Sequence, residues 1–304
     1  MDGMEPQSVD IFLRSLDNDY QQRLRDDAAQ TGGRLGLQVT ALAAQNDAAK
    51  QRAQVTEALD KANRLVALLV SPVRDDLSDL ARIAASKGIG WIVLNREAAY
   101  LAELSQEFPS QPLFSIEADQ TEVGRIQAQQ IKALTRDGDE AVCVTGPAAT
   151  SSAQRRLEGL RAELGDTPVK LTVLEADWTS EGSRLAISRW FKRLAAQAAL
   201  PACFCAQNDE MALGARQAIR DAASARDQPD LAQVPITGCD GSPAFGKRLV
   251  KEKRIAATVE IPSVSGPALE WIARARKKAE TPPTRIQLAV ASFPELGKLT
   301  RRKA

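Results

Sequence analysis

The feature that most constrains the fold of this chain is a regular alternation between short apolar runs and amphipathic stretches. The apolar runs have the length of buried strands and lie at residues 9–13, 37–42, 65–70, 90–94 and 113–116. Between them, apolar positions recur at helical spacing over residues 20–31, 48–61 and 77–87. Strands that alternate with helices predict a parallel, doubly wound α/β sheet.

The alternation begins again after Asp119. A helical pattern extends to residue 135, and strand-like runs follow at residues 141–145, 170–174, 202–206, 234–238 and 256–259. A chain of 304 residues is also long for a single hydrophobic core. The sequence therefore predicts two α/β lobes rather than one.

Histidine is absent from the chain. This removes the commonest general base, every Ser-His-Asp or Cys-His catalytic arrangement and every metal site that contains histidine. The sequence also has no GxSxG elbow, no P-loop and no GxGxxG segment after a strand. We therefore expect a protein that is not an enzyme.

The four cysteines lie in or beside apolar runs with the character of strands: Cys143, Cys203, Cys205 and Cys239. Free cysteine is among the most buried residue types. No CxxC pair or other metal-ligand spacing is present, so the sequence predicts buried, reduced thiols with no metal. A disulfide would instead indicate an oxidising compartment.

Charge and hydropathy limit the possible partners. The formal net charge is +1, and the 40 Lys and Arg residues are spread along the chain, so no basic face for nucleic acid is expected. No apolar run approaches the roughly 20 residues of a membrane-spanning helix, so a soluble protein without direct membrane insertion is expected. Residues 1–6 lack the features of a secretory signal. We expect a periplasmic protein if an export signal has been removed, and a cytoplasmic one otherwise.

Polar side chains follow several of the predicted strands. Four of the five asparagines fall just after a strand run: Asn18, Asn46, Asn95 and Asn208. Any one of them is also a typical helix N-cap or turn residue. Equivalent strand ends carry a second set: Asp17, Arg96, Trp178 and Asp240. Because ligands of parallel α/β sheets bind outside the carboxyl ends of the strands, the two sets together indicate a polar cleft with an aromatic wall.

Several short segments occur in a characteristic order. The most specific is AQNDEMALGA at residues 206–215, where a strand passes into a helix. The others are AQND at 44–47, SPV at 71–73, LNR at 94–96, GP at 146–147, RLEG at 156–159, ADW at 176–178 and GCDG at 238–241. In order and spacing, over roughly residues 9–290, they resemble the ribose-type periplasmic sugar-binding proteins of bacterial ABC importers, relatives of the ligand domains of lactose-repressor-like regulators.

This resemblance implies two doubly wound parallel-sheet lobes joined by a three-stranded hinge, the type I periplasmic-binding-protein fold. It places the first lobe at residues 1–118 and 261–287 and the second at 119–260 and 288–304, with crossings near 117–120, 259–262 and 286–290. It also implies a ligand in the cleft between the lobes, with hinge closure as the response. The residues expected to bind the ligand are Arg14, Asn18, Tyr20, Gln21, Asn95, Arg96, Gln154, Trp178, Asn208, Asp240 and Glu260.

The chemistry of these side chains suits a sugar, which presents flat C–H faces and hydroxyl groups. Trp178 and Tyr20 fit the faces as aromatic walls, although without the resemblance Trp178 fits a core position equally well. Paired hydrogen bonds to neighbouring hydroxyls suit the guanidinium, amide and carboxylate groups of Arg96, Asn95, Asn208 and Asp240.

The chain departs from the ribose-type pattern in ways that argue against ribose itself as the ligand. Asn95 replaces an expected Asp, Gln154 an Arg, Cys239 an aromatic residue and Glu260 a Gln, and the first loop has the sequence DNDYQ at residues 17–21. Arg14 occupies a position that is usually small. Together with Arg96 it suits an anionic or strongly polar group on the ligand, unless it is a surface residue at a strand end.

These features favour a solute-binding protein that captures a sugar or polyol and presents it to an ABC permease. The alternative is a ligand-sensing module for a histidine kinase, a chemoreceptor or a transcriptional regulator. Because only eight residues precede Val9, too few for a helix-turn-helix, we expect no binding to nucleic acid. A monomer without cofactor or metal is expected.

Overall fold

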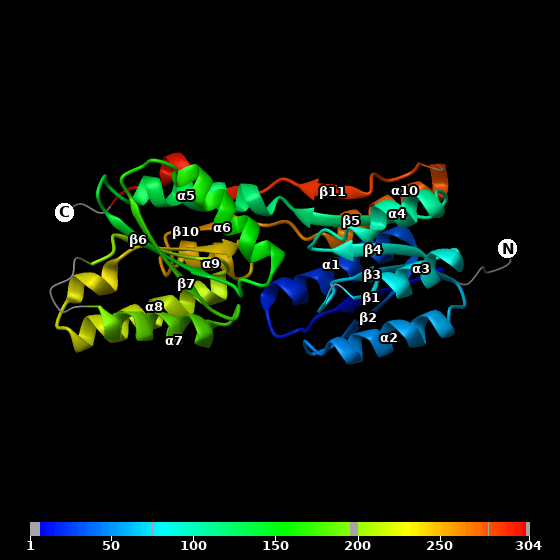
Figure 1. Cartoon of the computed structure of the whole chain (residues 1–304), viewed down its shortest axis with the longest axis horizontal. Helices are drawn as coiled ribbons and strands as arrows, with labels where there is room; N and C mark the ends of the chain where they lie inside the picture. The colour runs from blue at the N-terminus through cyan, green and yellow to red at the C-terminus, as the bar shows by residue number, and fades with distance from the viewer. Residues whose placement is uncertain (1–6, 75, 195–199, 279, 302–304) are drawn as a thin grey trace. The chain divides into compact units, whose positions relative to one another are not determined.

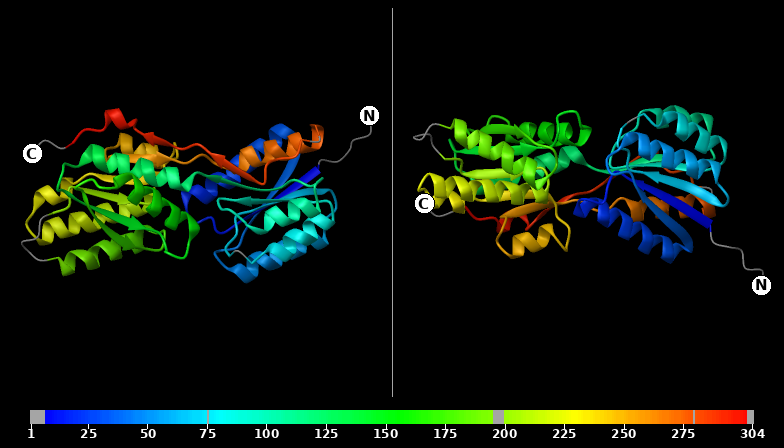
Figure 2. Two further views of the ribbon diagram at one scale, coloured as in Figure 1. Left: turned by 45° about the horizontal axis from the view of Figure 1, so that its top comes forward. Right: turned by 90° about the horizontal axis from the view of Figure 1, so that it is seen from below.

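The computed structural model describes residues 7–74, 76–194, 200–278 and 280–301, which form two compact units (Figure 1). The first unit comprises Met1–Ala118 and Ser263–Leu288, and the second Asp119–Pro262 and Ala289–Ala304. The chain therefore passes from one unit to the other three times, after Ala118, Pro262 and Leu288 (Figure 2). Each unit has its own sheet, which confirms the predicted two-lobed α/β fold.

The sheet of the first unit has six parallel strands in the order β11-β5-β4-β3-β1-β2. The strands are β1 (Gln7–Leu13), β2 (Leu37–Ala43), β3 (Leu65–Val70), β4 (Gly90–Leu94), β5 (Leu113–Ala118) and β11 (Arg285–Leu288). The first five match the predicted apolar runs closely. The sixth was not among those runs, because RIQL is short and only half apolar.

Helices cover both faces of this sheet. On one face lie α1 (Asp19–Leu35) and α10 (Ser265–Lys278), which pack side by side (Figure 2). The other face carries α2 (Ala48–Asp60), α3 (Ser78–Ser86) and α4 (Tyr100–Glu107). The carboxylate of Asp27 accepts a hydrogen bond of 2.8 Å from the backbone N–H of Gly266, which ties α1 to the start of α10.

The sheet of the second unit has the order β12-β10-β9-β8-β6-β7. Its strands are β6 (Glu140–Thr145), β7 (Lys170–Glu175), β8 (Cys203–Ala206), β9 (Ile236–Asp240), β10 (Ala257–Glu260) and β12 (Ala291–Phe293). Strand β12 is antiparallel to β10, unlike the parallel arrangement expected throughout. The strand before it in the chain, β11, belongs to the other sheet, so β12 does not continue the strand-helix-strand succession of the second sheet.

Helices cover both faces of the second sheet. On one face lie α5 (Gln120–Leu134) and α6 (Ser151–Leu164), and on the other α7 (Ser180–Arg193), α8 (Asp209–Ala225) and α9 (Gly246–Lys251). Two short 3-10 helices, η1 (Pro229–Gln233) and η2 (Leu296–Lys298), complete the unit. The buried carboxylate of Asp209 joins α8 to β9 and β10, because it accepts hydrogen bonds from the Gly241 N–H (2.8 Å) and the Thr258 hydroxyl (2.7 Å).

All four cysteines are buried and carry free thiols, in strands β6, β8 and β9. Across the described part of the chain, no group of three or more Cys, Asp or Glu side chains is arranged to hold a metal ion. Within those same residues, no helix is both long enough and apolar enough to cross a membrane.

Candidate functional site

The carboxyl ends of β1, β3 and β4 form one edge of the first sheet. Strand β3 lies between the other two, and Phe12, Val70 and Val93 stand in register across them. Arg14 and Asn95 each lie two residues beyond this level. The register therefore brings Arg14, Asn95 and the adjacent Arg96 to the same sheet edge, where parallel α/β sheets bind ligands.

Tyr20 and Asn95 form a linked pair at this edge. The Tyr20 hydroxyl donates a hydrogen bond of 2.5 Å to Oδ1 of Asn95. Asn95 adopts a left-handed backbone conformation with φ of 66°, which asparagine tolerates better than most residues. Its buried Nδ2 donates to no acceptor among the described residues. The pair thus fixes the Asn95 amide with an N–H group still available to a ligand.

Asn18 and Gln21 belong to the start of α1. Oδ1 of Asn18 accepts a hydrogen bond of 2.9 Å from the Gln21 N–H, so Asn18 serves as the helix N-cap, the alternative role for such asparagines. The Gln21 side chain is buried, and within the described part of the chain its Oε1 has no hydrogen-bond partner.

Arg14 is half-buried at the end of β1. Burial lowers the pKa of its guanidinium, and the nearby positive charge of Arg96 lowers that pKa further. Its Nε is buried and makes no hydrogen bond to any described residue. Two like charges thus lie close together at this strand-end edge.

The second sheet presents a comparable edge. The strand order arranges residues along this edge as follows: Glu260 at the end of β10, Asp240 at the end of β9, Asn208 after β8, Gly146 after β6 and Trp178 after β7. The strand-end positions expected from the sequence therefore lie in one row within this unit.

Trp178 is held in a fixed position on that edge. Its backbone has φ of 71°, which is uncommon for a bulky residue, and its carbonyl accepts a hydrogen bond of 2.9 Å from Nδ2 of Asn208. The guanidinium of Arg156 lies 5.7 Å from the ring centroid. The half-buried ring packs over Gly146, where an added Cβ would lie 2.5 Å from Cη2. The buried Nε1 of Trp178 donates to no described residue.

Asn208 supports this arrangement with both ends of its amide. Oδ1 accepts a hydrogen bond of 2.7 Å from the Met211 N–H and so caps α8, while Nδ2 holds the Trp178 carbonyl. The residue is 7% exposed. Its amide thus acts within the second unit, as the support of a helix and of the tryptophan loop.

The remaining predicted residues differ in their surroundings. Gln154 is exposed, and its amide donates a hydrogen bond of 2.7 Å to the Ala148 carbonyl. The Glu260 carboxylate forms an ion pair of 2.7 Å with Lys247. Asp240 is half-buried in a left-handed conformation with φ of 101°.

This architecture corresponds to a known family. Residues 9–268 match the family model of the periplasmic binding protein domain, which covers most of both units. The chain belongs to the periplasmic binding protein family. Membership in a family of binding proteins confirms the expectation that the chain is not an enzyme.

Individual members show the same relationship. The ribose import binding protein RbsB of Salmonella typhimurium is 28% identical over 258 residues, which cover 84% of this chain and 80% of that protein. The myo-inositol binding protein of Caulobacter, solved with myo-inositol, has a TM-score of 0.78 at 21% identity and covers 98% of this chain and 95% of its own. The fructose-binding periplasmic domain of the hybrid two-component system BT1754 has a TM-score of 0.76 at 22% identity and covers 94% and 90%.

The sequence did not predict a role for Arg156 at the strand-end edge of the second sheet. This side chain is 7% exposed, donates from Nε to Oε1 of Gln120 at 2.7 Å and also donates to the Gln207 carbonyl. These hydrogen bonds hold the Arg156 guanidinium in place over the Trp178 ring. The RLEG segment contained the signal, but the helical pattern alone does not show which face of α6 an arginine occupies.

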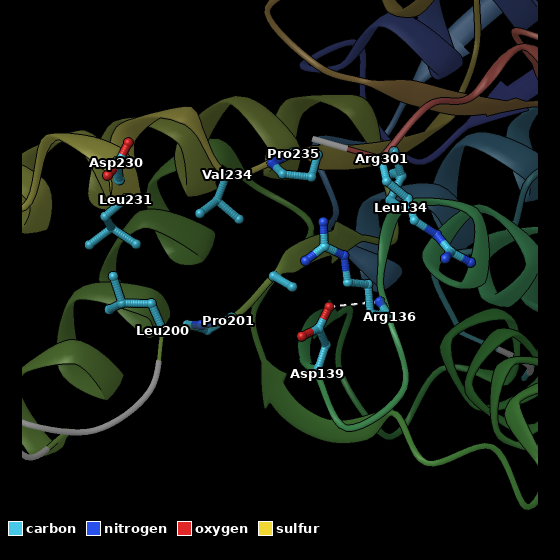
Figure 3. Close-up of a pocket in the computed structure, with 11 residues that line it drawn as sticks. Leu134, Arg136, Asp139, Leu200, Pro201, Asp230, Leu231, Val234, Pro235 and Arg301 are labelled. Atoms are coloured by element: carbon cyan, nitrogen blue, oxygen red, sulfur yellow. Dashed lines mark hydrogen bonds between the residues drawn. The ribbon is translucent and has the colours of Figure 1, made fainter. Parts of the chain in front are cut away.

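A pocket of about 370 Å³ in the second unit lies away from this edge (Figure 3). Its lining includes Arg136, Asp139 and Pro235, close to the starts of β6 and β9. The Arg136 N–H donates a hydrogen bond of 2.7 Å to Asp139 (Figure 3). None of the predicted ligand-binding residues lines it, so it is separate from the strand-end site.

Proposed function

We propose that this chain is a solute-binding protein that captures a sugar or polyol, with both units contributing strand-end side chains to one ligand, and presents it to an ABC importer. The observation that carries the proposal is the half-buried ring of Trp178, fixed on the sheet edge by Asn208, Gly146 and Arg156. The flat face of Trp178 complements the C–H face of a sugar ring, and its indole Nε1–H is a donor suited to a sugar hydroxyl.

The first unit supports the same ligand class. Nδ2 of Asn95 and Nε of Arg14 are buried donors without acceptors in the described residues, and they lie at the strand-end edge. Buried polar groups are normally hydrogen-bonded, so such donors suit a ligand rich in oxygen atoms. The ribose and myo-inositol of the relatives described above are ligands of this kind.

The mechanism follows from a ligand that contacts both units. Contacts made with both units at once exist only in the closed state, so the ligand shifts the population toward that state. The closed shape is then the signal that a membrane partner recognises. Neither half of the site binds strongly by itself.

Isothermal titration calorimetry tests the proposal, with a panel of ribose, arabinose, glucose, galactose, fructose, sorbitol and myo-inositol together with their acidic derivatives. At least one member should bind, and Trp178→Ala should weaken that binding about tenfold or more, because a stacked aromatic platform is lost. Trp271→Ala, on α10 of the first unit, is the matched control and should leave affinity unchanged. If no member of the panel binds while another class of solute does, the proposal is wrong.

A sensor is the second candidate, favoured by the similarity to the fructose-binding domain of a two-component system. Uptake of the labelled ligand separates the two roles. Cells that lack the chain should lose high-affinity uptake if it serves an importer. If it serves a sensor, uptake should persist while ligand-dependent transcription is lost.

A further inference from the structure

Arg14 is fixed by the backbone at the strand-end edge of the first unit. Its carbonyl accepts a hydrogen bond of 2.7 Å from the Asn46 N–H, which holds the loop after β1 against the loop after β2. Arg96 follows β4, two strands away, and neighbouring strands are about 4.8 Å apart. Two arginine side chains readily span a separation of roughly 10 Å. The charge of Arg96 is indeed close enough to act on Arg14.

The guanidinium of Arg14 lacks compensation within its own unit. Among the residues that the structure describes, no carboxylate forms an ion pair with Arg14, and its Nε is buried without an acceptor. Taking a cation out of water costs free energy unless it is paired. The neighbouring positive charge of Arg96 increases that cost.

Two buried N–H groups at this edge lack an acceptor among the described residues, while Oε1 of Gln21 in α1 is a buried acceptor without a donor there. Nδ2 of Asn95, like Nε of Arg14, is a buried N–H donor, and the Tyr20 hydroxyl already donates to the other end of that amide. A carboxylate or phosphate offers acceptors only and carries a charge opposite to that of Arg14. A neutral hydroxyl supplies an acceptor but no charge.

We propose that the ligand carries an anionic oxygen group, a carboxylate or a phosphate, and that this group binds Arg14 at the carboxyl end of β1 with Asn95 as a second donor. The inference rests on the proposed function and narrows its ligand class. The ligand is a hydroxylated acid, such as an aldonic acid, a uronic acid or a sugar phosphate. Arg14 is the residue that distinguishes it from the neutral parent sugar.

The test compares each neutral compound with its acidic derivative by titration calorimetry. The pairs are galactose with galacturonate and galactonate, glucose with gluconate and glucose 6-phosphate, and ribose with ribonate and ribose 5-phosphate. At least one acid should bind about 10- to 100-fold more tightly than its parent, since hydrogen bonds to charged groups are the stronger ones. The carboxylate and phosphate members show which anion is preferred. Raising the salt concentration should weaken binding of the acid and leave that of a neutral sugar unchanged.

Variants assign the preference to a residue. Arg14→Gln should abolish the preference for the acid, whereas Arg14→Lys should retain part of it. Arg276→Gln removes the same charge from an exposed position on α10 and should change nothing. Thermal unfolding confirms that each variant is folded, and the salt dependence of the unmodified protein provides a test that needs no variant.

The outcomes separate this inference from the proposed function. If neutral sugars or polyols bind as tightly as their acids, the inference is wrong and the proposed function stands. A preference for the acid that survives Arg14→Gln also overturns it, since another residue then receives the anion. If no sugar, polyol or acid of the panel binds, both fall.

Discussion

The substitution Gly146→Ala adds one methyl group beneath the Trp178 ring. The new Cβ would lie 2.5 Å from Cη2 and still closer to Cζ2 and Cε2. Carbon atoms in ordinary contact are about 3.5–4.0 Å apart, so the ring must recede by at least about 1 Å. Overpacking of this kind typically costs about 1–3 kcal/mol. The ring would move away from Gly146 and lose its place beside Arg156.

Thermal unfolding of the ligand-free protein measures the effect. For a unit of this size, each kcal/mol lowers Tm by about 2–4 °C, so a decrease of about 2–12 °C is expected. A double-mutant cycle with Trp178→Ala then isolates the cause. Once the ring is gone, Gly146→Ala should cost almost nothing, which gives a coupling energy of about 1–3 kcal/mol between the two positions.

Gly297→Ala is the matched control, because an added Cβ there meets no atom within 4 Å. It should leave Tm nearly unchanged. The reasoning is refuted if Gly146→Ala does not lower Tm, or if its cost is the same with and without the Trp178 ring.

Three further predictions follow from buried polar groups. Asp209→Asn removes one of two carboxylate oxygens that accept hydrogen bonds and should lower the free energy of unfolding by about 1–3 kcal/mol in denaturant titrations. Burial raises the pKa of Asp10, opposed in part by a hydrogen bond from Thr40, so the folded state binds this proton more tightly than the unfolded state. Asp10→Asn should therefore raise the free energy of unfolding at pH values above the pKa of Asp10 in the folded state, and this gain should disappear below about pH 3.9. Equal free energies of unfolding for the variant and the unmodified protein at pH 7 would contradict this. Burial also raises the pKa of the Cys203 and Cys239 thiols, so a thiol reagent should react slowly with the folded protein. After denaturation without reductant, the reagent should titrate four thiols, and fewer than four would reveal a disulfide.

The fold was predictable because its signal is local. Each apolar run that indicated a strand overlaps a strand of the structure, and inner strands such as residues 65–70 are largely buried, whereas the edge strands β2 and β7 are partly exposed. Strands β11 and β12 were not anticipated. Each is four residues or shorter, and β11 pairs with β5, from which it is separated in the chain by the segment Asp119–Pro262 of the second unit and by α10. Such pairing depends on contacts that a window of sequence does not contain.

The sequence predicted where several residues of the candidate site lie in the fold, but not which hydrogen bonds their side chains make within it. The sequence placed Asn18, Asn208 and Trp178 just after strands, and there they lie. Whether an asparagine caps a helix or faces solvent depends on the side chains around it, and both asparagines cap helices. The support that Trp178 receives from Arg156 joins residues from different elements, so only the folded structure reveals it.

The late return of the chain to the first unit has a consequence for biosynthesis. Strand β11 closes the β5 edge, and α10 covers the apolar face beside α1, yet both are made only after Pro262, when the long segment Asp119–Pro262 of the second unit has been translated. Until then the nascent chain exposes an unpaired strand edge and an apolar surface. The amino-terminal half therefore cannot finish folding on the ribosome ahead of the rest, as amino-terminal domains usually do. A chaperone that shields exposed apolar surface has its longest opportunity to bind at this half of the chain.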